Sequence, residues 1–193
     1  MPMVMESQDI RKAIRESLEA KEALLSLAGE IEALCRMGEE VLKGGGKLLF
    51  CGNGGSACDA AHASCELTGW FLQKERRPLP AVALGFETPA LTAMANDKGY
   101  DEAFARQVQA LGRPGDLLVG ITTSGRSPSV VRALERARSL GIRTAVLTGR
   151  EGGPAGSVAE FNLRVPSSDT PRIQECHLLV LHIFSQWLEA ACA

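Results

Sequence analysis

The strongest chemical signal in the sequence is a histidine and a glutamate four positions apart. His62 and Glu66 come shortly after the glycine-rich sequence CGNGGSACD at residues 51–59. In a helix, the two side chains lie about 40° apart around the axis and one turn apart along it, on a shared face. That arrangement suits a metal ion, a general base with its orienting partner, or a surface ion pair. The spacing alone leaves all three open.

The stretch before this pair has the residues of a tight loop that leads into a helix. Gly52, Gly54 and Gly55 permit unusual backbone dihedrals and the close approach of a ligand. Ser56 and Asp59, three positions apart, resemble the capping box with which many helices begin. The stretch lacks the GK[ST] sequence of a P-loop and a clean GxGxxG pattern, so nucleotide binding is not favoured.

A second loop, ITTSGRSPS at residues 121–129, has the features of a phosphate site. Ser127 and Pro128 fit the N-cap and the first position of a helix that follows an apolar strand. Free backbone amides at a helix N-terminus, together with nearby hydroxyl groups, suit a phosphate monoester. The hydroxyl groups belong to Thr122, Thr123, Ser124 and Ser127. A well-capped turn between a strand and a helix explains the same residues.

The C-terminal segment supplies further polar side chains. Thr170 and Pro171 fit the N-cap and first position of a long helix with an apolar surface. Gln174, His177 and His182 interrupt that surface. A histidine in such a helix is more often a core or interface residue than a ligand.

The elements that must position these residues are predicted by the apolar pattern. Five short apolar segments indicate buried strands, at residues 47–52, 81–85, 116–122, 143–149 and 161–166. A helix is expected after each of the first four, and two helices, roughly 7–28 and 31–43, precede the first strand. The sequence therefore predicts an α/β fold, a parallel sheet flanked by helices on both faces, with an N-terminal helical element. Ligands bind such sheets at the carboxyl ends of the strands, where both loops fall.

Composition and charge exclude several classes of protein. A length of 193 residues suits one domain, and 45% apolar residues, 23% charged residues and a net charge of −2 are typical of a soluble globular protein. The basic cluster from Lys74 to Arg77 is short and mixed, so we interpret it as a solvated loop and expect no nucleic-acid partner. We expect no membrane-spanning segment and a cytoplasmic location. Six cysteines without a CxxC pair are expected to be reduced.

Four blocks of sequence, taken together, resemble the phosphoheptose isomerases, also called sedoheptulose-7-phosphate isomerases, of the sugar-isomerase (SIS) domain family. The blocks are GNGGSACDAAHASCELTG, NDKGYDEAFARQVQALG, GDLLVGITTSGRSPSVVRAL and TPRIQECHLLVLHIF, and the resemblance covers nearly the whole chain, 1–193. It implies a five-stranded parallel sheet and a homotetramer. We expect the N-terminal helices, at about residues 7–43, to take part in assembly. It also implies an aldose–ketose isomerase, an intramolecular oxidoreductase that interconverts sedoheptulose 7-phosphate and D-glycero-D-manno-heptose 7-phosphate for lipopolysaccharide heptose.

The resemblance also implies which residues act. The family's substrate contacts fall at Asn53, Gly54, Gly55, Glu66, Asn96, Asp97, Thr122, Thr123, Ser124, Ser127 and Gln174. Its zinc ligands, for one Zn²⁺ per subunit, fall at His62, Glu66, Gln174 and His182. At position 70 the family often has arginine where this chain has Trp70, which leaves Arg126 as an alternative source of positive charge.

The implied reaction moves a carbonyl between two carbons through a cis-enediol, which needs a base near the carbon and an acid or cation near the developing oxyanion. Glu66 and His182 are the candidates for this acid/base pair. In one straight helix, Gln174 and His182 would stand about 12 Å apart along the axis, whereas each must approach the same zinc within ~2.1 Å. We therefore expect either an irregular helix near Gln174 or ligands from two subunits, with the site at their interface.

Two alternatives to this isomerase stay open. One is a non-catalytic SIS protein that binds a replication initiator, although such a protein has no chemical reason to keep Glu66 and His182. The other is an isomerase for another sugar phosphate, or a regulatory domain that binds one. A regulator would need a DNA-binding domain, for which this chain has no room.

Overall fold

The computed structural model describes residues 6–193, so the first five residues of the predicted domain lie outside the described residues. The α-helices are α1 (Ser7–Ala23), α2 (Ala28–Lys43), α3 (Gly55–Thr68), α4 (Thr88–Asp97), α5 (Ala103–Leu111), α6 (Pro128–Ser139), α7 (Gly153–Val158) and α8 (Thr170–Cys192). The strands are β1 (Leu48–Gly52), β2 (Ala81–Ala83), β3 (Leu117–Ile121), β4 (Arg143–Thr148) and β5 (Phe161–Arg164). Each strand lies within a predicted segment, and a helix follows each of the first four, as expected.

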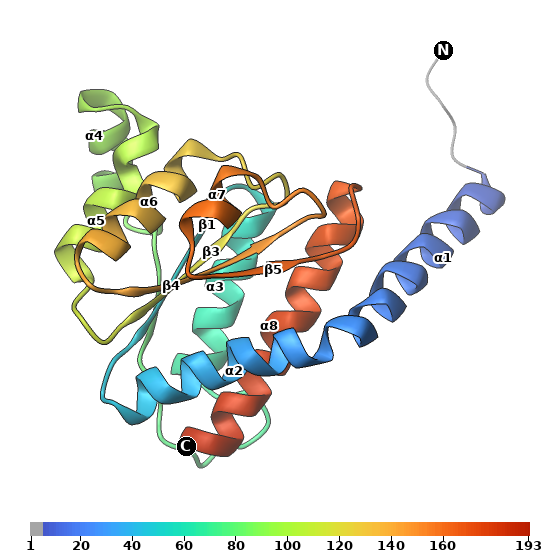
Figure 1. Ribbon diagram of the computed structural model, residues 1–193, viewed down its shortest axis with the longest axis horizontal. Coiled ribbons are helices and arrows are strands. Elements are labelled where there is room, and N and C mark those ends of the chain that lie inside the picture. Colours follow the sequence, from blue (N-terminus) through green and yellow to red (C-terminus); the bar gives the residue numbers. More distant parts are fainter. Residues whose placement is uncertain (1–5) are drawn as a thin grey trace.

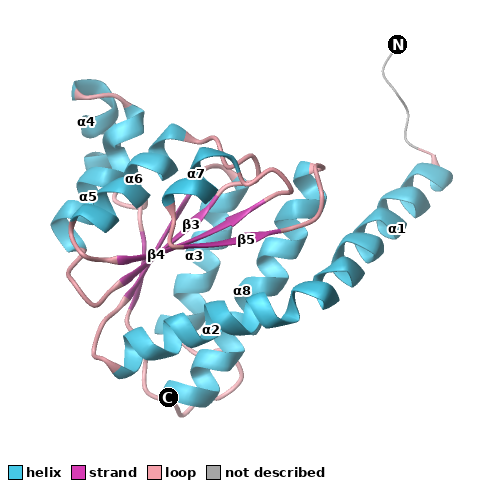
Figure 2. Cartoon of the chain, viewed as in Figure 1, coloured by secondary structure: helices cyan, strands magenta, loops and turns pink. Residues whose placement is uncertain are grey.

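The strands form one sheet in the order β2-β1-β3-β4-β5, and every neighbouring pair is parallel. Figure 2 shows this sheet as a twisted fan of strands between two groups of helices. The predicted fold class, a five-stranded parallel sheet flanked by helices, is confirmed. From β1 the chain moves outward to β2 on one side, and later to β3, β4 and β5 on the other. The gap between β1 and β3 is therefore the topological switch point, where such folds bind ligands.

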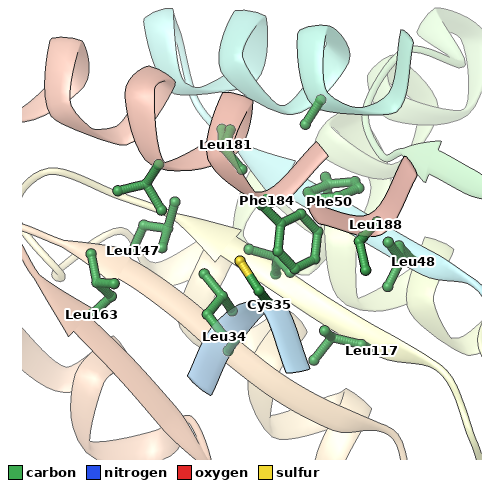
Figure 3. Packing of buried hydrophobic residues seen from close by; sticks show 14 of the residues in the cluster. Leu34, Cys35, Leu48, Phe50, Leu117, Leu147, Leu163, Leu181, Phe184 and Leu188 are labelled. Atoms are coloured by element: carbon green, nitrogen blue, oxygen red, sulfur yellow. The ribbon is translucent and has the colours of Figure 1, made fainter. Parts of the chain in front are cut away.

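The core consists of two apolar layers, one on each face of the sheet. Along β1, Leu48 and Phe50 face the layer of α2, α3 and α8, whereas Leu49 and Cys51 face the layer of α5 and α6. Figure 3 shows the first layer, where the rings of Phe50 and Phe184 meet edge to face with their centroids 6.4 Å apart. Burying side chains of this size stabilises the fold by about 1.5–3 kcal/mol each. This packing holds α3 and α8 against each other on one face of the sheet.

The two N-terminal helices form a nearly continuous arm. A short 3₁₀ turn, Leu24–Leu27, joins α1 to α2, so the break comes earlier than the predicted one between residues 28 and 31. Gly29 lies inside α2, because a single glycine costs a helix only about 1 kcal/mol. In Figure 1, α1 projects beyond the sheet and its covering helices, and it contains no buried residue.

The basic cluster after α3 is only partly solvated. Lys74 and Arg77 are exposed, but the Arg76 side chain is 1% exposed and forms an ion pair with the equally buried Glu189. The interpretation of this cluster as a solvated loop is therefore wrong for Arg76, because the carboxylate that buries it is distant in sequence.

Within the part of the chain that the structure describes, no helix is both long and apolar enough to cross a membrane. All six cysteine thiols are free, and only Cys58 and Cys65 are exposed.

Candidate active site

Two loops meet at the switch point of the sheet. The first follows β1 and the second follows β3, and these strands end side by side, with Gly52 paired with Ile121. The amide Nδ2 of Asn53 donates a hydrogen bond of 3.0 Å to Oγ of Ser129, across the gap between the loops. The phenol of Tyr100 donates one of 2.6 Å to Oδ1 of the same asparagine. Asn53 is thus fixed from both sides at the place where a ligand is expected.

The loop after β1 starts α3 differently from the prediction. Gly54 is the N-cap, with a φ of 58° and a ψ of −124°, and no side chain caps the helix. The predicted capping box at Ser56 and Asp59 is wrong, since the helix has already begun at Gly55. The physical reason is that Gly54 adopts a backbone conformation that other residues rarely take, which turns the chain into the helix earlier.

Gln174 lies against the start of α3. A Cβ atom at position 55 would stand 2.5 Å from Nε2 of Gln174, so the end of the Gln174 side chain packs closely on Gly55. The helix that carries Gln174, α8, is continuous from Thr170 to Cys192. The expected irregularity near Gln174 is therefore wrong, and the N-cap is Asp169, one residue before the predicted Thr170.

The loop after β3 has the predicted helix start. Ser127 is the N-cap of α6, Pro128 follows it, and the hydroxyls of Thr122 and Ser127 lie 3.1 Å apart. Gly125 has a φ of 66°, and a Cβ atom there would stand 2.0 Å from the carbonyl oxygen of Gly152. The loop therefore packs directly on the loop that follows β4.

A cavity of about 200 Å³ opens beside this loop. Thr123 and Ser124 line it together with two arginines, Arg126 and Arg150. Arg126 forms an ion pair of 2.9 Å with Glu151, and both side chains are largely exposed. Position 70 does not line this cavity, and its cationic groups come from the loops after β3 and β4.

Three of the predicted zinc ligands converge between α3 and α8. Nε2 of His62 lies 2.8 Å from Nε2 of His182 and 3.5 Å from Oε1 of Glu66. The two imidazole rings meet edge to face, with their centroids 4.9 Å apart. The ring of Phe71 stacks on the other side of His182, with the centroids 5.7 Å apart. The predicted pairing of His62 with Glu66 on one helix face is present, and His182 joins it from a segment more than a hundred residues away.

The donor types fit zinc, because His₂Glu is a ligand set of catalytic zinc sites. The spacing between the two imidazole nitrogens, 2.8 Å, is that of a hydrogen bond, whereas two ligands on a tetrahedral zinc stand ~3.4 Å apart. Among residues 6–193, no three His, Cys, Asp or Glu side chains are arranged to hold a metal ion. Gln174 stands beside Gly55, about two helical turns from His182. One chain therefore does not assemble all four predicted ligands.

Asp59 is a further titratable group on the same face of α3. Burial raises the pKa of its carboxyl group to about 6, and the nearby His62 opposes this rise. Its Oδ2 atom is buried and has no hydrogen-bond partner within residues 6–193. A carboxyl group that titrates near neutral pH therefore lies one turn from His62.

His177 does not join the site. It is fully buried, and its Nε2–H donates a hydrogen bond of 3.2 Å to the carbonyl oxygen of Thr148. Burial lowers the pKa of this imidazole to about 4, although the hydrogen bond acts in the other direction. His177 is a neutral core histidine, as a lone histidine in an apolar helix more often is.

Asn96 and Asp97 lie at the exposed C-terminal end of α4. Within the described residues, their side-chain hydrogen bond is the one between them, 2.8 Å from Nδ2 of Asn96 to Oδ1 of Asp97. Figure 1 shows α4 at the outer edge of the molecule. Among residues 6–193, neither of these two side chains forms a hydrogen bond to His62, Glu66 or His182.

Sequence reasoning missed several residues that shape the site. They are Asp59 as a titratable group, Phe71, Tyr100, Ser129 and Arg150. Tyr100 is the single tyrosine of the chain and follows Asp97 closely, but only the fold brings its hydroxyl to Asn53.

Comparison with known proteins gives one consistent result. Residues 11–149 match the SIS domain family. The phosphoheptose isomerase of Aliarcobacter butzleri is 47% identical over 185 residues, which cover 96% of this chain and 97% of that protein. The structure of a phosphoheptose isomerase from Neisseria gonorrhoeae is 39% identical, with a TM-score of 0.90, over 95% of this chain and 98% of that one. The structure of a phosphoheptose isomerase from Francisella tularensis is 36% identical, with a TM-score of 0.92, over 96% of this chain and 100% of that one.

Proposed function

Because the chain belongs to the phosphoheptose isomerases of the SIS domain family, we propose that it interconverts sedoheptulose 7-phosphate and D-glycero-D-manno-heptose 7-phosphate through a cis-enediol. The observation that carries this proposal is the convergence of His62, Glu66 and His182 between α8 and α3, the helix that begins at the loop after β1. We also propose a cytoplasmic role in supplying heptose for surface polysaccharide.

We assign the proton transfers to Glu66 and His182. Glu66 removes a proton from C1 of the open-chain ketose, the electrons of that C–H bond form the C1–C2 double bond, and His182 protonates the carbonyl oxygen on C2. Glu66 then returns a proton to C2, and His182 takes the hydroxyl proton from O1 as the C1–O1 carbonyl forms, which gives the aldose and restores both side chains. A carboxylate and an imidazole are the groups that such steps use at neutral pH.

The phosphate of the substrate is assigned to the loop after β3. The amides at the N-terminus of α6 and the hydroxyls of Thr122 and Ser127 supply donors there. The adjoining cavity contributes the cationic side chains of Arg126 and Arg150. Asn53, held by two hydrogen bonds, then faces the sugar hydroxyls. The remaining proposed substrate contacts are Gly54, Gly55, Asn96, Asp97, Thr123, Ser124 and Gln174.

We include zinc in the proposal because two histidines and a glutamate, a set of donors that zinc prefers, converge at the site. The residues that would hold it are His62, Glu66, Gln174 and His182, and the bound ion would stabilise negative charge on a substrate oxygen. A ligand held by the metal is a poor base, so Glu66 and His182 would have to leave the ion when they transfer protons. Within one chain, α8 keeps Gln174 two turns from His182. We therefore propose that the Gln174 ligand comes from a second copy of the chain, and that the other three ligands come from the first. That arrangement makes the site an interface site.

We propose that the chain assembles as a homotetramer, in which residues 1–193 form one SIS domain and the N-terminal helices serve assembly. In support, α1 projects from the body (Figure 1) and carries a stripe of large apolar side chains, each more than half exposed. The stripe consists of Ile10, Ile14, Leu18 and, in the following turn, Leu25. A stripe of this kind fits another copy of the same helix pair.

The test is to incubate the protein with sedoheptulose 7-phosphate and to identify the product by NMR, with fructose 6-phosphate as the control ketose. The expected product is the aldose 7-phosphate, formed far faster than any aldose from the hexose phosphate. Preference for the hexose phosphate would overturn the substrate, and no turnover of either sugar would overturn the function. Dilution to monomers should abolish turnover.

A further inference from the structure

A buried ion pair joins the segment after α3 to the end of α8. Nε of Arg76 lies 2.8 Å from Oε1 of Glu189, and the two side chains are 1% and 2% exposed. Taking two charges out of water is costly, so a pair of this kind is weak evidence for stability by itself. The atoms that the two side chains contact indicate another role.

The guanidinium of Arg76 caps the C-terminal end of α3. Nη2 donates to the carbonyl of Glu66 at 2.5 Å, and Nη1 donates to the carbonyls of Leu67 at 2.9 Å and Arg77 at 2.8 Å. The last carbonyls of a helix lack donors within the helix, and a cation there also interacts favourably with the helix dipole. Arg76 therefore holds the turn from which the Glu66 side chain projects.

The carboxylate of Glu189 holds the loop that covers His182. Its two oxygens accept hydrogen bonds from the amides of Phe71 at 3.0 Å and Leu72 at 2.8 Å. These bonds fix the backbone of Phe71, whose ring stacks on His182 at 28°. Burial alone would raise the pKa of Glu189, but the hydrogen bonds from Arg76 and the loop amides outweigh it and lower the pKa to about 2.

We propose that Arg76 and Glu189 are positioning residues of the isomerase site, one holding Glu66 through its backbone and the other holding His182 through the ring of Phe71. This inference rests on the acid/base roles proposed above for Glu66 and His182. One ion pair thereby links the two helices that carry the proposed acid and base, at the end of α3 opposite the phosphate loop.

The chain offers a second ion pair as a control, at the starts of β1 and β3. Nζ of Lys47 lies 2.5 Å from Oδ2 of Asp116, whose side chain is 4% exposed. Asp116 also accepts hydrogen bonds from the backbone amides of Lys47 and Arg113. This pair precedes β1 and β3, and the hydrogen bonds of Asp116 run to Lys47 and Arg113 rather than to α3, the Phe71 loop or α8. It shares the structural role of the Arg76 pair without its contacts to the acid/base group.

The experiment compares Phe71→Leu, Phe71→Tyr, Glu189→Gln and Asp116→Asn in the full-length protein. For each variant, kcat and KM with sedoheptulose 7-phosphate are measured, together with the thermal unfolding midpoint and the ring resonances of His182. A misplacement of 1 Å can cost on the order of 10²-fold in rate. Phe71→Leu and Glu189→Gln should therefore lower kcat by about tenfold or more, with KM within about twofold. Glu189→Gln, which keeps the Phe71 ring, should also shift the His182 resonances.

The two remaining variants separate positioning from stability. Phe71→Tyr keeps the ring and should restore kcat to within about twofold, whereas Asp116→Asn should lower the unfolding midpoint but leave kcat and the His182 resonances unchanged. Wild-type kcat in Phe71→Leu would overturn the inference, even if Glu189→Gln fails to fold. An inactive wild-type protein would instead overturn the proposed function, while the His182 resonances would still report the positioning.

Discussion

The buried imidazole of His177 should make the stability of this protein depend on pH in a defined window. The pKa of His177 is lowered to about 4 by burial, against about 6.5 in an unfolded chain. As pH falls below about 6.5, His177 binds a proton in the unfolded chain, whereas in the native protein it does so only near pH 4. The free energy of unfolding therefore decreases as the pH is lowered through this window, by up to about 3 kcal/mol for this one residue.

The perturbation that isolates this effect is His177→Gln. Glutamine has an amide that can still donate to the carbonyl of Thr148, but it cannot titrate. At pH 7 the variant should be less stable than wild type by about 1–3 kcal/mol, because the packing changes. Towards pH 4 the wild type should lose about 3 kcal/mol relative to the variant. The difference in unfolding free energy between the two proteins should therefore shrink or change sign.

The assay is urea unfolding at several values between pH 7 and pH 4, at one fixed protein concentration because assembly contributes to stability. Other groups titrate in the same window, including Asp59, whose raised pKa acts with the opposite sign. Taking the difference between wild type and variant removes their contributions. A difference that stays constant from pH 7 to pH 4 would refute the burial argument for His177.

Two further predictions concern the switch-point loops. Gly125→Ala should lower the unfolding free energy by about 2 kcal/mol or more, because the residue has a φ of 66° and its new Cβ would stand 2.0 Å from the carbonyl of Gly152; urea unfolding checks this, and a loss below about 0.5 kcal/mol would contradict it. Tyr100→Phe removes the hydrogen bond of 2.6 Å to Asn53. It should raise KM up to about tenfold with kcat nearly unchanged, since one such bond is worth about 0.5–1.5 kcal/mol; an unchanged KM in steady-state kinetics would show that this bond does not serve binding.

Local chemistry predicted the elements of the fold well. The five apolar runs bounded by glycine or polar residues became the five strands, and Ser127 with Pro128 marked the start of α6. The errors came where a backbone conformation or a packing partner overrode the local pattern. Gly54 started α3 before the expected cap, and α2 ran through Gly29.

The candidate site was predictable only in part, because its residues come from distant segments. Helical spacing placed His62 beside Glu66, but no pattern in α8 distinguishes His182, at the site, from the core residue His177. The resemblance to a family supplied that distinction. The ion-pair partner of Arg76 lies more than a hundred residues away. The residues next to Arg76 in sequence therefore predicted that it is solvated, although it is buried.

The most direct test of the acid/base assignment follows solvent hydrogen during turnover. Sedoheptulose 7-phosphate is incubated in D₂O with wild type, Glu66→Gln and Cys65→Ser, the last replacing an exposed neighbour on the same helix, and the sugars are monitored by ¹H NMR. Wild type and Cys65→Ser should form aldose with deuterium at C2, whereas Glu66→Gln should be slower by about 10²–10⁴-fold, the range for loss of a general base. Aldose formation by Glu66→Gln at a rate within about twofold of wild type would contradict the assignment of Glu66 as the base.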